Sequence, residues 1–160
     1  MYMSKLAVIL HGAHGVEVVK QFAKLAYGFE SGLFVLSKPT SAAAQIAVPE
    51  VSKLAFKQGK RFLVVPDIDD VLELLAPSVS LFFVEGGKGE AFNEEEVVAA
   101  LKAGQVVSLF FSASEPGFSS KELERGKTVS LGPLGEVGCL ALASIALFRV
   151  WSKLTKVSTS

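Results

Sequence analysis

Short, continuous apolar runs alternate with helix-like segments along almost the whole chain, and this alternation constrains the fold more than any other feature. A short apolar run without polar interruption is typical of a strand that is buried on both faces. Strands are predicted over Leu6–Leu10, Leu33–Leu36, Phe62–Val65, Val79–Val84, Gln105–Phe111 and Thr128–Leu131. The pattern therefore predicts a single-domain α/β fold, in which a parallel sheet is sandwiched between helices on both of its faces.

Local signals place several helix ends between these strands. Pro49 suits a first helical turn and Gly59 a helix C-terminus, while Asp67 or Asp69 can cap the helix that follows the third strand. The last apolar segment is predicted to be helical from Leu134 to about Leu154. The domain is predicted to span residues 1–154, with a frayed tail over 155–160.

Composition limits the classes of protein to which the chain can belong. The 160 residues fit one domain, half of them are hydrophobic, and the formal net charge is zero. A balanced charge lowers the expectation of a broad nucleic-acid-binding surface without excluding a local basic patch. The single cysteine, Cys139, rules out an intrachain disulfide. We find no signal peptide, and Val137–Phe148 is too short to cross a membrane, so a cytoplasmic protein with no membrane partner is expected.

Three loops rich in Gly, Pro and Ser follow predicted strands, and they are the main candidates for a ligand site. Open α/β sheets bind ligands outside the carboxyl ends of their strands, and glycine lets the backbone approach a ligand closely. Such loops could hold an adenosine group through backbone hydrogen bonds, or they could simply turn the chain. The predicted cofactor-binding residues are Glu85, Gly86, Gly87, Ser112, Ala113, Ser114, Glu115, Gly117, Leu131, Gly132, Leu134 and Gly135.

His11 and His14 lie in the predicted loop after the first strand, and they are the only histidines. They could transfer a proton or contact a substrate phosphate, or they could be exposed loop residues without a role. No further Cys or His lies nearby to complete a metal site, so no metal is predicted. The acidic clusters at Asp67–Asp70 and Glu94–Glu96 are explained by helix capping.

The final helix is apolar around most of its circumference. A helix of this kind must be buried on most sides, either as an ordinary core helix or half in the core and half in a subunit interface. We favour the second arrangement, a homodimer paired through the C-terminal helix, because a terminal helix is rarely enclosed by its own chain. Motif searches find no phosphate-binding P-loop, no nucleophile elbow and no dinucleotide fingerprint.

Two segments carry a resemblance to a known family. Ser114–Ser119 reads SEPGFS and Val129–Leu134 reads VSLGPL, and both are similar to signatures of the SPOUT, or α/β-knot, class of RNA methyltransferases. Phe82–Glu85 resembles the preceding strand and loop of that class. Val48–Ala55 is similar to a small archaeal group labelled as a RecB-family nuclease, although no Glu-x-Lys nuclease motif occurs in the chain.

The resemblance implies a trefoil knot closed by the last helix, S-adenosylmethionine held by the knot loops, and methyl transfer to an unidentified RNA. His14, His11 and Glu136 are the polar groups expected near the methyl. Two features depart from the family pattern: the first helix lacks the Arg of ribose methylating members, and Gly135–Gly138 replaces an Arg and Glu-Thr-Ala element. These departures favour the alternative of a non-catalytic knotted dimer that binds RNA or a protein, and a nuclease ranks third.

Overall fold

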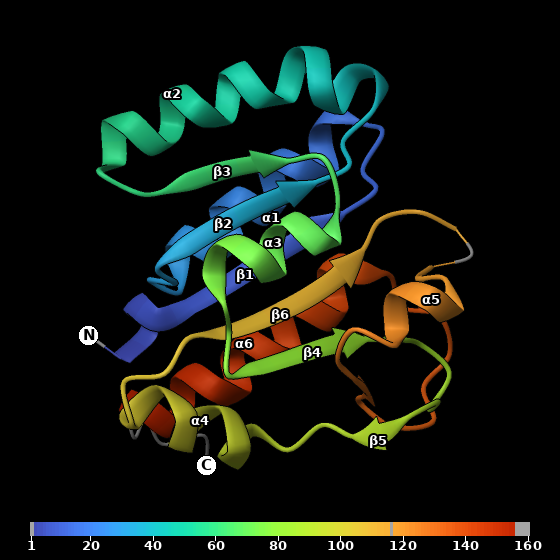
Figure 1. Ribbon diagram of the computed structural model, residues 1–160. Helices are drawn as coiled ribbons and strands as arrows, with labels where there is room; N and C mark the ends of the chain where they lie inside the picture. The colour runs from blue at the N-terminus through green and yellow to red at the C-terminus, as the bar shows by residue number, and fades with distance from the viewer. Residues whose placement is uncertain (1, 116, 156–160) are drawn as a thin grey trace.

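In the computed structural model, which describes residues 2–115 and 117–155, the strands form one parallel sheet (Figure 1). The sheet has seven strands in the order β3-β2-β1-β6-β4-β7-β5, and every described pairing is parallel. The strands are β1 Leu6–His11, β2 Leu33–Ser37, β3 Phe62–Val65, β4 Val79–Phe83, β5 Glu90–Ala91, β6 Val107–Ser112 and β7 Lys127–Ser130. The α/β parallel-sheet fold predicted from the sequence is therefore confirmed.

Two details of the sheet differ from the sequence prediction. β5 was not predicted, because two residues are too few to produce an apolar period, and it forms beside β7 at the edge of the sheet. His11 was expected in a loop, yet it is the last residue of β1 and pairs with Ser37 and Ser112 on the neighbouring strands. The carboxyl ends of β1, β2 and β6 are therefore aligned at one edge of the sheet.

Helices cover the two faces of the sheet unequally (Figure 1). The larger core lies under four helices, α1 Val16–Gly28, α2 Val48–Gln58, α4 Glu94–Lys102 and α6 Cys139–Thr155. The smaller core, on the opposite face, lies under α3 Ile68–Leu75 and α5 Ser120–Leu123. A 3₁₀-helix over Tyr2–Lys5 precedes β1, and a π-helical turn over Ala43–Ala47 leads into α2.

Two helix ends lie at the residues that the sequence predicted. Asp67 caps α3 in a reciprocal capping box with Asp70, and Gly59 ends α2 in the left-handed conformation at φ 64°. The prediction for the last helix was wrong at its start, because α6 begins at Cys139 and residues 131–138 form a loop. Gly138 has φ 89°, a conformation that an α-helix excludes.

α6 reaches Thr155, the first residue of the predicted tail, while residues 156–160 lie outside the described residues. No helix in the described part of the chain combines the length and the apolar character needed to cross a lipid bilayer. Pro116, which belongs to the first family-like segment, also lies outside the described residues.

Candidate functional site

The three predicted loops all begin at the same end of the sheet, where its strands have their carboxyl termini. β6, β4 and β7 are adjacent and parallel, so the segments after Phe83, Ser112 and Ser130 all begin at the carboxyl ends of neighbouring strands. Glu85, Gly86 and Gly87 follow β4. Ser112 ends β6, and Ala113, Ser114, Glu115 and Gly117 follow it; Leu131, Gly132, Leu134 and Gly135 lie between β7 and α6. The topology thus gathers the predicted cofactor-binding residues at one edge.

Glu85 joins the loop after β4 to the loop before α6. Its carboxylate accepts hydrogen bonds from the backbone amides of Val137 at 2.8 Å and Gly138 at 3.2 Å. The same two loops also touch at Gly87, where a Cβ would stand 3.1 Å from Cα of Pro133. A side chain at position 87 would therefore separate the two loops, and glycine at φ 72° keeps them in contact.

The loop after β6 is attached to β1. The amide of Ala113 donates to the carbonyl of His11 at 2.8 Å, and a Cβ on Gly12 would lie 3.0 Å from Oγ of Ser114. Ser112 and Ser114 also share a hydroxyl hydrogen bond of 3.1 Å. The histidine-containing segment thus lies directly beside one of the predicted cofactor loops.

Several loop glycines open onto free space. A Cβ built on Gly86, Gly117, Gly132 or Gly135 would meet no atom within 4 Å outside its chain neighbours. Three of these four glycines have positive φ, between 76° and 120°. Leu134, which lies between Gly132 and Gly135 in the chain, is 44% exposed. Bare backbone next to an exposed apolar side chain is a suitable surface for a flat, partly polar ligand such as adenosine.

His11 is not the exposed loop residue that was considered as one alternative. Its side chain is buried, Nδ1 lies 2.8 Å from Oγ of Ser37, and Nε2 lies 2.9 Å from Oε2 of Glu122. Burial lowers the pKa of the imidazole, the nearby charges of Glu122 and Asp67 oppose this shift, and Lys38 adds to it. The ring is therefore favoured in its neutral form.

Sequence reasoning missed both carboxylates near His11. Glu122 lies on α5 and Asp67 at the start of α3, and neither is close to His11 in the chain. A local signal for α5 was present, because Ser119 and Glu122 have the spacing of a capping box and form one. No local signal could have shown that α5 would place Glu122 against the end of β1.

The other two predicted catalytic residues are exposed. His14 lies in the loop after β1, and its Nδ1 atom is hydrogen-bonded to Oγ1 of Thr40, which lies after β2. Glu136 lies in the loop before α6. Burial raises the pKa of the Cys139 thiol at the start of α6, which disfavours the reactive thiolate form.

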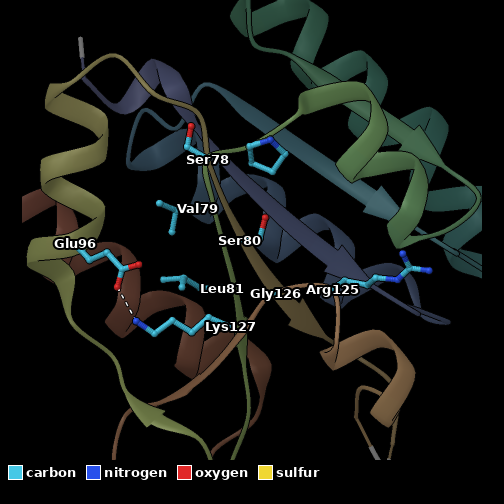
Figure 2. A pocket seen from close by; sticks show the side chains of 9 residues that line it. Ser78, Val79, Ser80, Leu81, Glu96, Arg125, Gly126 and Lys127 are labelled. Atoms are coloured by element: carbon cyan, nitrogen blue, oxygen red, sulfur yellow. Dashed lines mark hydrogen bonds and ion pairs between the residues drawn. The ribbon is translucent and has the colours of Figure 1, made fainter.

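Two cavities lie at the opposite end of the sheet, where its strands begin. One of about 330 Å³ is lined near the start of β4 by Ser78, Ser80, Arg125 and Lys127, and Figure 2 shows Lys127 paired with Glu96 there. The other, of about 170 Å³, lies at the starts of β1 and β2. Neither cavity includes a predicted cofactor-binding residue.

Sequence comparisons relate the chain to proteins described as nucleases. Residues 41–149 match the family model described as RecB-family nuclease (DUF2122). Two relatives carry the name "putative type II restriction enzyme". The relative from Methanocaldococcus jannaschii is 32% identical, and the match covers 95% of this chain and the whole of the relative. The one from Aeropyrum pernix is 31% identical over 88% of each chain.

Structural comparisons relate the fold to methyltransferases. A structure titled as a probable methyltransferase from Bordetella pertussis has a TM-score of 0.72 at 16% identity, over 96% of this chain and 98% of its own. The SpoU methyltransferase AviRb from Streptomyces viridochromogenes, in complex with the cofactor AdoMet, has a TM-score of 0.69 at 13% identity. The match covers 94% of this chain and 61% of the AviRb chain. At these identities the likeness shows a shared fold.

Proposed function

The chain belongs to the family described as RecB-family nuclease (DUF2122), and we propose that it binds S-adenosylmethionine and transfers its methyl group to RNA. One observation carries the proposal. The loops after β4, β6 and β7 leave one edge of a sheet with the SpoU methyltransferase fold, and Glu85 holds two of them together. Ligands of open α/β sheets bind at this edge.

The residues at this edge fit the cofactor. The adenosine group needs close approach to the backbone, and Gly86, Gly117, Gly132 and Gly135 have open space where a side chain would stand. The exposed side chain of Leu134 offers an apolar contact for the adenine ring. The cofactor would thus be held mainly by backbone groups of the three loops, with Glu85 fixing the position of the loop before α6.

We further propose that α6 closes a trefoil knot with the loop after β6, and that α6 pairs two chains. In a single chain, Ile145 and Phe148 on α6 are 40% and 42% exposed, although both are large and apolar. Val137, in the preceding loop, is 45% exposed. An apolar surface of this kind beside a ligand site is typical of a subunit interface.

When bound, S-adenosylmethionine supplies a sulfonium methyl that an RNA nucleophile can attack directly. The protein must then orient the nucleophile and accept its proton. His14 suits this task better than His11, because it is exposed and lies two residues after Gly12, which approaches Ser114. Both ring nitrogens of His11 are engaged. Glu136 is the second exposed candidate for the proton acceptor.

Titration calorimetry with S-adenosylmethionine and S-adenosylhomocysteine tests the cofactor proposal. We expect saturable binding of one molecule per chain, and the absence of heat at millimolar cofactor would overturn the proposal. Transfer of a labelled methyl group to total RNA of the source organism tests the reaction. His14→Gln should slow transfer at least tenfold without changing cofactor affinity, because general-base catalysis contributes at least this much.

A second candidate function is a non-catalytic dimer of the same fold that binds RNA or a protein. The observation in its favour is the Gly135–Gly138 segment, which stands where some methyltransferases of the class carry an Arg and Glu-Thr-Ala. Cofactor binding without methyl transfer to RNA would identify this function. The nuclease activity that the names of the relatives describe is tested by incubating the same protein preparation with DNA and a divalent cation.

A further inference from the structure

Three side chains from distant parts of the chain meet beside the end of β1. His11 ends β1, Asp67 caps α3, and Glu122 belongs to α5. One potential ligand atom from each residue lies within 4.8 Å of the other two. A metal ion bound by atoms about 2.1 Å away brings its ligands to separations of roughly 3–4 Å, so small side-chain movements would suffice.

The ring of His11 is held in one orientation. Its Nδ1 is within hydrogen-bond distance of Ser37 Oγ, and the ring of Phe118 stacks against it with centroids 5.9 Å apart. His11 and Ser37 are both buried, at 3% and 0% exposure. This arrangement directs Nε2 toward Glu122, and a hydroxyl on the second ring nitrogen is the kind of contact that orients metal-binding histidines.

The two carboxylates are also held in place. Oε1 of Glu122 accepts the amide of Ser119 at 2.8 Å, which leaves Oε2 facing His11. Oδ1 of Asp67 accepts the amide of Ile68 at 2.7 Å. The helix caps thus orient both carboxylates before any ion arrives, and the exposed position of Asp67 gives an ion a route from solvent.

We propose that His11, Asp67 and Glu122 form a binding site for one divalent transition metal ion. One imidazole nitrogen and two carboxylate oxygens suit Zn²⁺, Mn²⁺, Fe²⁺ and Co²⁺ better than Mg²⁺ or Ca²⁺, which prefer oxygen ligands alone. On binding, the ring proton resides on Nδ1 and is donated to Ser37, while the lone pair of Nε2 faces the ion. A neutral imidazole is the form that this requires.

The ion would connect β1, the start of α3 and the short helix α5. α5 follows the loop that contains Ser114 and Glu115, so a metal at this site would restrain the loop next to the proposed cofactor site. None of its three ligands belongs to the predicted cofactor-binding residues, so binding of the metal and of the cofactor can be measured separately.

Calorimetric titration of the metal-free protein with Co²⁺, and separately with Zn²⁺ and Mn²⁺, tests the proposal. We expect one ion per chain, and we expect Co²⁺ to produce visible absorption bands of a site with nitrogen and oxygen ligands. Asp67→Asn and Glu122→Gln should each weaken binding at least tenfold. Both variants preserve the helix caps, because Asn caps helices well and Gln can replace Glu in a capping box.

Asp69→Asn is the matched control, since Asp69 lies in the same first turn of α3 but pairs with Arg125. Its metal affinity should equal that of the unmodified protein. Ser37→Ala should weaken binding about tenfold to a hundredfold through the lost contact to Nδ1. The proposal is overturned if the unmodified protein shows no saturable binding below about 1 mM, or if either Asp67→Asn or Glu122→Gln binds as tightly as Asp69→Asn.

Discussion

The carboxylate of Glu85 accepts the backbone amide of Val137 at 2.8 Å, across 52 positions of sequence. Glu85 directly follows the β4 segment, whereas Val137 lies just before α6. A second bond, from the amide of Gly138, satisfies a backbone donor that would otherwise need a partner near the start of a helix. One side chain therefore sets the distance between two of the loops that we assign to the cofactor.

Replacement of Glu85 by Gln should loosen this connection. The neutral amide offers one weaker acceptor in place of a charged carboxylate, so we expect a loss of about 1 kcal/mol in unfolding free energy. Affinity for S-adenosylmethionine should fall about tenfold. Urea unfolding and calorimetry measure the two effects. Glu73→Gln, an exposed change on α3, should alter neither, and unchanged cofactor affinity in Glu85→Gln would contradict the assigned role.

A bulky side chain at Gly135 should block the cofactor without disturbing the fold. Position 135 has no positive φ, and its Cβ would meet no atom within 4 Å, so Gly135→Leu should unfold at the same temperature as the unmodified protein. Its affinity for S-adenosylhomocysteine should fall at least tenfold. Gly28 at the end of α1 has the same freedom, and Gly28→Leu is therefore the control. Equal affinities in the two variants would place the ligand elsewhere.

The proposed dimer should depend on the outer face of α6. Phe148 is 42% exposed in a single chain, and a charge introduced there would have to be buried in the interface. We expect Phe148→Asp to halve the mass measured by light scattering after gel filtration. Phe56→Asp makes the same change at an 88% exposed phenylalanine on α2 and should leave the mass unchanged. An unmodified protein with the mass of one chain would refute the interface.

The ion pair between Glu94 and Arg149 should make stability depend on pH. Burial alone would raise the pKa of Glu94, but the hydrogen bond and charge of Arg149 outweigh it and hold that pKa below the usual 4.5. A carboxylate with a lowered pKa stabilises the fold above its unfolded pKa and loses that contribution as pH falls through the lowered value.

We therefore expect Glu94→Gln to lower the unfolding free energy by about 1 kcal/mol at pH 7, and the difference from the unmodified protein to shrink below about pH 4.5. Urea unfolding of both proteins at pH 7 and at pH 3 measures this difference. Glu95→Gln, on the same turn but with an exposed partner in Lys153, should produce a smaller change. A difference that is undiminished at pH 3 would mean that the charge of Glu94 is not its source.

Some of these features were accessible from local patterns. The apolar runs predicted six of the strands, and Asp67 and Gly59 marked helix ends correctly, because such signals depend on residues only a few positions apart. The loop residues from Glu85 to Gly135 were selected for the same reason, as turns after strands. The start of α6 was misplaced because the apolar pattern continues through Leu134 and Val137, whereas Gly138 breaks the helix.

The amino-acid sequence by itself determined six of the seven strands, most helix ends and the glycine loops, since short-range periodicity and turn chemistry specify them. Only the tertiary structure decided which loops are neighbours, because the strand order β3-β2-β1-β6-β4-β7-β5 depends on packing across the whole chain. It also decided that His11 is buried against Glu122, 111 positions away, and close to Asp67. Contacts at that separation form only when the helices and the sheet pack together, and no local pattern encodes them.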